Sequence, residues 1–292
     1  MYQQLIEGFI QQERLPATYL LDATQCFLPL IRDIEAEIQS NQQAPFLIGI
    51  NGAQGTGKST MAKLLSTLLT ESGHRVANLS IDDFYYSKSK RQELADTVHP
   101  LLASRGVPGT HDIELALRLL EELGSAGPEQ QVSLPGFDKS LDDCRPDAAC
   151  EKISGPVDII ILEGWFVGVK PQAKDTLSPA INALEDKEDS DGRWRAYVNT
   201  QLAGAYQSLF EKFHMLLMLQ APRFEQVLEW RSLQEEKLRA CVAEDASGLM
   251  DRKAIERFIQ HFERLTRHCL LTLPESADRV FQLDSQHRIH LS

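Results

Sequence analysis

The stretch from Gly52 to Thr60 constrains the fold of this chain more than any other. Its residues, Gly52-Ala53-Gln54-Gly55-Thr56-Gly57-Lys58-Ser59-Thr60, match the phosphate-binding pattern G-x-x-x-x-G-K-[ST] at every required position. An apolar run at residues 46–50 precedes the stretch, and residues 60–70 after it carry apolar side chains at helical spacing. The order strand, glycine loop, helix predicts an α/β fold around a nucleoside triphosphate site. A chance match in a glycine-rich turn is the alternative, which these flanks disfavour.

The residue types of this loop suit an anion. Glycine lets the backbone turn tightly and bring its N–H groups close to phosphate oxygens. The helix that follows directs the positive end of its dipole at the same anion. Lys58 supplies a mobile positive charge for the β- and γ-phosphates, and the Ser59 hydroxyl can reach a Mg²⁺ ion, with Thr60 nearby.

The composition argues against several classes of protein. The chain has 292 residues and a net charge of −12, which disfavours a nucleic-acid-wrapping or membrane-surface role. No apolar run approaches the ~18 residues of a membrane span, and the first residues lack a signal-peptide pattern. The five cysteines contain no CxxC pair, so we expect reduced thiols rather than disulfides or a zinc site. These features predict a cytoplasmic protein, monomeric or homodimeric, without nucleic-acid or membrane partners.

Alternating strand and helix patterns predict the rest of the architecture. Apolar runs indicate four further strands, and the intervening stretches read as helices, which is typical of a parallel sheet with helices on both faces. We therefore expect an α/β P-loop NTPase fold with a five-stranded, mainly parallel sheet, and one domain over residues 1–292. The four strands are expected at residues 75–82, 157–165, 214–219 and 279–283.

The segments outside the sheet have their own predictions. Residues 1–42 read as an N-terminal helical extension, and residues 194–212 as one helix. Residues 86–111 read as a polar, loop-rich stretch, and the acidic insertion 171–193 as a solvated loop. A long helix from residue 223 is the expected core of a lid over residues 223–245.

Acidic residues at predicted strand ends are candidate catalytic groups. Functional side chains collect at the carboxyl ends of parallel strands, so Asp82 is the expected general base. For Asp82, a helix-cap or turn role is the alternative. For its neighbour Asp83, the catalytic role and the cap or turn role have equal weight. Glu163 follows four apolar residues, as a Walker-B acid does, and is the expected Mg²⁺ carboxylate. Asp158, at the other end of that strand, is expected to be structural.

Basic residues in the polar stretches are candidate anion ligands. Arg105 and His111 are bracketed by turn residues, and Lys139 and Arg145 lie in extended, loop-like chain. Each could hold an anionic substrate group or the transferred phosphoryl, or could be a surface charge. Arg231, in the predicted lid helix, could neutralise phosphate charge during transfer. The alternative is that this helix is simply exposed to solvent and stabilised by Glu–Lys pairs.

Taken together, these segments resemble the phosphoribulokinase/uridine kinase/pantothenate kinase superfamily of small-molecule P-loop kinases. The loop 52–60, the strand end Ser80-Ile81-Asp82-Asp83-Phe84-Tyr85 and the strand end Leu162-Glu163-Gly164 carry the resemblance. Further blocks look like the D-glycerate 3-kinase branch, over roughly residues 20–290. These blocks are residues 105–112 (RGVPGTHD), 134–140 (LPGFDKS), 163–165 (EGW), 191–195 (DGRWR) and 230–235 (WRSLQE).

The resemblance implies a kinase that uses ATP and Mg²⁺ to phosphorylate D-glycerate to 3-phosphoglycerate. The aspartate of the S-x-D-x-F-Y motif is the general base of the superfamily, and it maps to Asp82. Ser59 and Glu163 would organise the metal, and Lys58 would act on the phosphates. The acceptor, a small hydroxy acid, would be bound by Asp82, Tyr85, Arg105, His111, Lys139 and Arg145.

Some alternatives stay open. The branch often carries a further Gly-Arg where this chain has Cys144-Arg145-Pro146. We expect Arg145 to take the role of the arginine in that pair. A kinase of the same fold could act on a nucleoside, on pantothenate or on another hydroxy acid. An NTP-hydrolysing switch or assembly protein is a different class, but the chain lacks the guanine-reading motif N-K-x-D.

Overall fold

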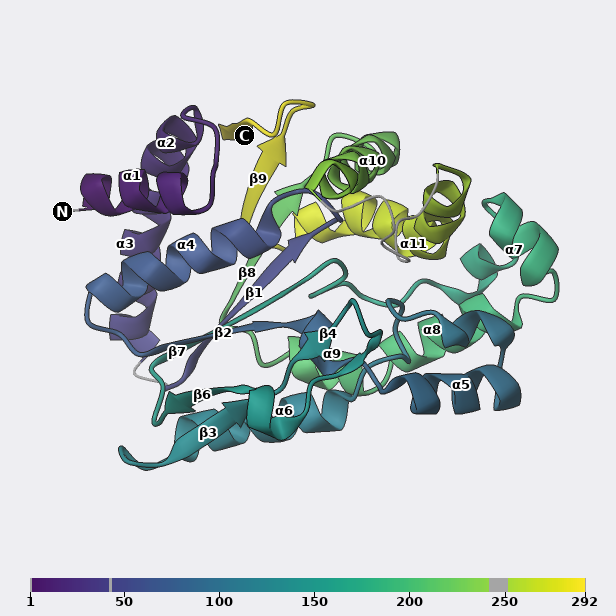
Figure 1. Ribbon diagram of the computed structural model, residues 1–292, viewed down its shortest axis with the longest axis horizontal. Coiled ribbons are helices and arrows are strands. Elements are labelled where there is room, and N and C mark those ends of the chain that lie inside the picture. Colours follow the sequence, from purple (N-terminus) through teal and green to yellow (C-terminus); the bar gives the residue numbers. More distant parts are fainter. Residues whose placement is uncertain (1, 42–43, 242–251, 292) are drawn as a thin grey trace.

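A central sheet runs through the structure, a computed structural model that describes residues 2–41, 44–241 and 252–291 (Figure 1). The strand order across the sheet is β10-β9-β8-β1-β7-β2. The strands are β1 (Phe46–Gly52), β2 (Val76–Ser80), β7 (Ile159–Gly164), β8 (Met215–Gln220), β9 (Arg279–Leu283) and β10 (Ile289–Leu291).

Five strands of the main sheet, β1, β2, β7, β8 and β9, run parallel to one another. β1 pairs with β7 on one side and with β8 on the other, β2 pairs with β7, and β9 pairs with β8. The predicted, mainly parallel sheet is confirmed, but the count of five strands is wrong because β10 adds an antiparallel sixth strand at the edge beside β9. Its sequence, Ile289-His290-Leu291, is too short to give a periodic pattern of its own.

Helices cover both faces of the sheet (Figure 1). One core combines α1, α3, α4 and the start of α10 with Ile159 and Ile161 of β7, and the other combines α6, α8, α9 and α11 with Ile160 and Leu162. The helices are α1 (Tyr2–Gln12), α2 (Tyr19–Asp22), α3 (Leu28–Asn41), α4 (Lys58–Glu71), α5 (Lys88–Thr97), α6 (Ile113–Ser125), α7 (Ala183–Glu188), α8 (Arg193–Leu202), α9 (Ala205–Phe210), α10 (Phe224–Cys241) and α11 (Arg252–Thr272).

Two of the sequence predictions for helices need correction. The stretch 86–111 contains the helix α5, whose N-terminus is capped by Ser87 and whose buried side chains are only Arg91 and Ala95. A buried arginine adds nothing to an apolar pattern, so the periodicity missed this helix. The helix predicted at 194–212 is two helices, because Gly204 between α8 and α9 has a non-helical backbone (φ −94°, ψ −126°).

The acidic segment 171–193 is also different from its prediction. It contains α7, and two of its carboxylates are buried in ion pairs rather than solvated. Glu185 lies 2.6 Å from Nη2 of Arg264, and Asp189 lies 2.8 Å from Nη1 of Arg195. Each arginine comes from another helix, so the acidic composition alone could not indicate the pairing.

Smaller elements surround the main sheet. β3 (Gln131–Leu134) pairs with β6 (Glu151–Ser154), and β4 (Phe137–Asp138) pairs with β5 (Asp143–Cys144) to form a short hairpin. The chain between β2 and α5 begins with a 3-10 turn, Ile81–Phe84. Across the part of the chain that the structure describes, no helix has the length and apolar character needed to cross a membrane.

Candidate active site

The glycine loop connects β1 to α4 at the carboxyl edge of the sheet. Gly55 and Gly57 have φ angles of 83° and 89°, in the left-handed region that favours glycine. Thr56 closes the turn by donating its hydroxyl to the carbonyl oxygen of Ala53 at 2.8 Å. The helix α4 begins at Lys58, so its N-terminus faces the inside of the loop, as an anion site requires.

Glu163 lies beside the loop, on the neighbouring strand. The register places it opposite Ile50 of β1 and Ser80 of β2. Ser59 Oγ donates to Glu163 Oε1 at 2.7 Å, and Lys58 Nζ lies 3.9 Å from Oε2. That second oxygen is buried and has no hydrogen-bond partner among the described residues. A hydroxyl and a carboxylate are oxygen ligands of the kind that Mg²⁺ prefers, so this pair fits a Mg²⁺ ion.

Asp82 follows the end of β2 and is held on both carboxylate oxygens. Oδ1 accepts the hydroxyl of Tyr85 at 2.8 Å, and Oδ2 lies 2.6 Å from Nζ of Lys139. Burial raises the pKa of Asp82, but the charges of Lys139 and Lys58 and the two hydrogen bonds outweigh it. The pKa of this carboxyl therefore lies below its ordinary value, and at neutral pH the group is ionised and able to accept a proton.

Asp83 has the role of a cap. Its Oδ2 accepts the backbone N–H of Ser80 at 3.0 Å, and the Ser80 hydroxyl accepts from the turn in return. Burial raises the pKa of Asp83 to about 6, helped by the charges of Asp82 and Glu163 and opposed by the bond from Ser80. The capping role that sequence left open for both aspartates therefore belongs to Asp83, and this cap fixes the turn that presents Asp82.

The β4–β5 hairpin brings basic residues to the same place. Its turn carries Lys139, which contacts Asp82, and Asp142, whose carboxylate pairs with Arg105. The Arg105 guanidinium lies 5.4 Å from the centre of the Phe137 ring, which in turn lies 5.2 Å from the ring of Tyr85. Arg105 therefore lies on the same side of the site as Asp82.

Arg145 lies at the far end of the same hairpin. Its backbone N–H donates to the carbonyl oxygen of Gly136, and the carbon stem of its exposed side chain runs over that glycine. In the described part of the chain, the side-chain partners of Asp82 are Lys139 and Tyr85, not Arg145.

His111 lies behind the site. Its ring is 2% exposed and stacks on Tyr85 with 4.5 Å between centres. Nδ1 lies 2.8 Å from the hydroxyl of Tyr206, which also accepts the backbone N–H of Gly109. Burial lowers the pKa of His111 to about 3, so the ring is neutral. In this position His111 supports the ring of Tyr85 from behind. Tyr206 was missed in the sequence, because a tyrosine in an apolar helix gives no pattern that marks it.

The start of α10 is anchored to the glycine loop. Trp230 stacks on His287 with 4.2 Å between ring centres, and Nε2 of His287 donates to the carbonyl oxygen of Gly55 at 2.9 Å. Neither contact was predicted. Arg231 is half-buried beside Trp230. Residues 242–245 of the predicted lid lie outside the described residues.

A cavity of about 260 Å³ opens next to the loop. Gly57, Thr60 and Met61 form one wall, the chain after β9 forms a second, and the N-terminal segment around Tyr19 forms a third. The cavity is large enough for part of a small ligand and lies directly beside the N-terminus of α4.

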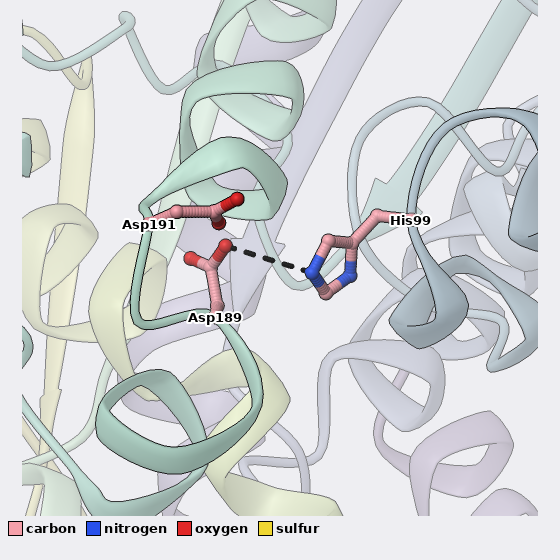
Figure 2. Close-up of side chains that lie close together, drawn as sticks. All are labelled: His99, Asp189 and Asp191. Carbon is pink, nitrogen blue, oxygen red and sulfur yellow. Dashed lines mark ion pairs between the residues drawn. The ribbon is translucent and has the colours of Figure 1, made fainter.

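Figure 2 shows a separate cluster of His99, Asp189 and Asp191 that resembles a metal site. Nδ1 of His99 accepts the backbone N–H of Leu101, and Nε2 faces Asp189 at 3.8 Å. Asp189 also accepts from Arg195 of α8, so the cluster links the turn that follows α5 to the segment between α7 and α8.

Comparisons with known proteins agree with this geometry. A family model for the methylmalonyl Co-A mutase-associated GTPase MeaB matches residues 30–88, which contain the glycine loop. The uncharacterized kinase mug58 of Schizosaccharomyces pombe is 35% identical over 225 residues, or 75% of this chain and 78% of that protein. The chloroplastic D-glycerate 3-kinase of Arabidopsis thaliana is 28% identical over 82% of this chain, which spans 52% of that protein.

More distant comparisons support the same group. A pantothenate kinase of Streptococcus gordonii is 32% identical over 45% of this chain and 40% of that protein. The solved structure of D-glycerate 3-kinase from Cryptococcus neoformans has a TM-score of 0.71 at 24% identity, and the match covers 90% of this chain and 96% of that one. This last likeness shows the P-loop kinase fold. The chain therefore belongs to the family of P-loop kinases that includes D-glycerate 3-kinase and its kinase-like relatives.

Proposed function

We propose that the protein transfers the γ-phosphoryl group of ATP to a hydroxyl group of a small hydroxy acid, with D-glycerate as the first candidate and 3-phosphoglycerate as the product. The observation that carries the proposal is the position of Asp82. The nearby charge of Lys58 in the glycine loop lowers the pKa of this carboxylate, and Lys139 is paired with one of its oxygens. This arrangement suits a base that faces both the phosphates and an anionic acceptor.

The chemistry follows from these positions. The loop N–H groups and Lys58 bind the triphosphate, and Asp82 accepts the proton of the acceptor hydroxyl as its oxygen attacks the γ-phosphorus. Ser59 and Glu163 would hold Mg²⁺, which when bound neutralises charge on the phosphoryl oxygens. Arg231 of the lid region is proposed to assist in the same way, and closure of this region excludes water as a competing acceptor.

The acceptor side is proposed to use the basic residues around the hairpin. Arg105 and Lys139 would bind the carboxylate of a hydroxy acid, because a guanidinium and an ammonium match that charge. Arg145 is proposed as an outer ligand on the same hairpin. Tyr85 orients Asp82 through their hydrogen bond, and His111 is proposed to hold the Tyr85 ring in place from behind.

The nucleoside end of ATP is proposed to occupy the cavity beside Gly57 and Thr60. It begins where the triphosphate would end, and it combines apolar walls with polar groups, as small-molecule sites do. Filling it by Met61→Trp is expected to weaken ATP binding.

An ADP-release assay over a panel of acceptors tests the proposal. D-Glycerate, other hydroxy acids, pantothenate and uridine would each be added with ATP and Mg²⁺. D-Glycerate-dependent ADP release with formation of phosphoglycerate is the expected result. Pantothenate is the second candidate, because the chain is similar to pantothenate kinases. Its turnover would show that the proposed acceptor is wrong, while the proposed phosphoryl transfer would stand.

Hydrolysis of ATP at one rate with every acceptor and without any would instead indicate a switch or assembly protein. The cytoplasmic location and the monomeric or homodimeric state stay predictions, for which cell fractionation and light scattering are the measurements.

A further inference from the structure

Each of two basic residues on the acceptor side faces a carboxylate of this same chain. Lys139 is paired with Asp82, and Arg105 is paired with Asp142. Lys139 and Asp142 both belong to the turn of the β4–β5 hairpin, which therefore contributes one positive and one negative charge to the site. A hydroxy acid also carries a carboxylate, close to the hydroxyl group that must reach Asp82. The hairpin turn thus presents a carboxylate where the acceptor would present its own.

Asp142 is held in this position by a second arginine. Its Oδ2 lies 3.0 Å from Nη2 of Arg91, and its carbonyl oxygen accepts from the same nitrogen at 2.7 Å. Arg91 is 1% exposed, and its remaining donors bind the carbonyl oxygens of Tyr86 and Ala103. Asp142 has a φ of 55°, a left-handed conformation that turns its side chain between the two guanidinium groups. Arg91 is therefore a fixed anchor, and Arg105 is the outer partner.

The outer pair is open to exchange. The Arg105 side chain is 26% exposed and that of Asp142 is 33% exposed, so water and small solutes reach both. The hairpin strands have only two residues each, and the turn side chain Leu141 is 71% exposed. Ion pairs with this exposure contribute little net stability, so a soluble anion can compete with them.

We propose that Asp142 is an internal stand-in for the acceptor carboxylate at Arg105, and that it thereby selects the class of acceptor. A carboxylate can replace Asp142 because it offers the guanidinium two oxygens in the same fork geometry. A neutral acceptor, such as a nucleoside, cannot. When the acceptor carboxylate takes the place of Asp142 at Arg105, the side chain of Lys139 would turn from Asp82 to the acceptor, so a carboxylate acceptor frees its own base. The inference rests on the proposed function, because it takes Arg105 to be the acceptor ligand.

The test compares Asp142→Asn with Asp143→Asn. Both changes remove one negative charge from the same hairpin, but Asp143 accepts only from the backbone N–H groups of Lys88 and Cys144 in the described structure. Asparagine tolerates the left-handed backbone at position 142. We expect the KM for D-glycerate to fall about two- to fivefold in Asp142→Asn relative to Asp143→Asn, the range that the loss of one exposed pair allows.

Other results overturn the inference. A KM that rises in Asp142→Asn shows that Asp142 orients Arg105 for the acceptor, and equal KM values in the two variants show that Asp142 does not compete. Asp142→Gly is the second variant, because it removes the competing side chain altogether, whereas the amide of Asp142→Asn can still bind Arg105. It keeps the backbone carbonyl that binds Arg91 and also suits the left-handed conformation. Thermal melting identifies which variants are folded.

A binding measurement separates this inference from the proposed function. Acetate is the smallest carboxylate probe, and calorimetric titration measures its binding without turnover. We expect Asp142→Asn to bind acetate more tightly than Asp143→Asn does, and the gain to disappear when Arg105→Met is added. If the wild type does not phosphorylate D-glycerate, the proposed acceptor is wrong, while the acetate result still decides the role of Asp142. Equal acetate affinities in the two variants overturn the inference.

Discussion

The ammonium nitrogen of Lys139 lies 2.6 Å from one carboxylate oxygen of Asp82. The two residues come from different elements, a short hairpin and the turn after β2, and the hydroxyl of Tyr85 holds the second oxygen of the carboxylate. Asp82 is thus ionised and fixed before any acceptor arrives. Its position relative to Lys58 makes it the residue whose removal should separate nucleotide binding from phosphoryl transfer.

Asp82→Asn is expected to lower kcat by about 10²- to 10⁴-fold, the usual contribution of a general base, because an amide oxygen cannot take the hydroxyl proton. ATP binding, measured by calorimetry, is expected to persist because the glycine loop is untouched. Asp143→Asn removes the same charge nearby and serves as the control. Acceptor phosphorylation at the wild-type rate in Asp82→Asn would show that another group takes the proton.

Lys58→Met is expected to weaken ATP binding by about 10- to 100-fold, the effect of losing a hydrogen bond to a charged group. Lys63→Met is the matched control, since Lys63 lies on the same helix, is exposed and pairs with Glu13. Calorimetric titration of both variants with an unreactive ATP analogue gives the comparison. Equal affinities would remove the glycine loop from the proposed nucleotide site.

Gly55→Ala is expected to lower the free energy of unfolding more than Gly57→Ala does. Both residues have a left-handed backbone, which costs alanine about 1–2 kcal/mol. A Cβ at residue 55 would also lie 2.8 Å from Cβ of Trp230, whereas one at residue 57 would meet nothing within 4 Å. Urea unfolding without nucleotide measures the difference, and equal losses would argue against tight packing between the loop and α10.

Glu185→Gln is expected to lower the free energy of unfolding by about 3–5 kcal/mol, because it leaves the guanidinium of Arg264 without its buried counter-ion. Glu188→Gln breaks an exposed pair with Arg257 three residues further on the same helix, and should cost about 0–1 kcal/mol. Urea unfolding at pH 7 compares the two. Similar small losses would show that the segment 171–193 is held by something other than its carboxylates.

His111 is expected to make the protein less stable as the pH falls. Burial lowers its folded-state pKa to about 3 from an ordinary value of 6.5. Between these values the unfolded chain binds a proton that the folded chain does not, so the free energy of unfolding decreases by about 1.4 kcal/mol per pH unit on acidification. His111→Gln should remove this part of the slope between pH 6 and pH 5. An unchanged slope in the variant would mean that His111 is not buried as neutral imidazole.

The sequence predicted the parts of the fold that depend on local pattern. The glycine loop needs particular residue types at fixed spacing, and buried parallel strands are continuous apolar runs, so β1, β2, β7, β8 and β9 were found. Their carboxyl ends then pointed to Asp82 and Glu163, since neighbouring parallel strands must end at one edge of the sheet. The family followed from the same segments. The roles assigned to individual site residues stay predictions.

The parts that sequence missed depend on partners that are distant in the chain. Arg91 is buried because Asp142 and backbone carbonyl groups satisfy it, and Glu185 is buried because Arg264 does. A charged residue reads as solvent-exposed until its partner is known, so α5 and the segment 171–193 were both assigned to loops. His287 and Tyr206 act through hydrogen bonds and ring contacts that leave no spacing in the sequence.

The hydrogen bond from His287 to the carbonyl of Gly55 has a consequence for how the protein is made. The glycine loop is translated before its support on this side, because His287 follows Gly55 by 232 positions. The strand β8, which flanks β1, also follows the loop by a long interval. A chain translated only as far as α9 therefore carries the whole phosphate-binding motif but lacks β8 beside β1 and the contact of His287 with Gly55.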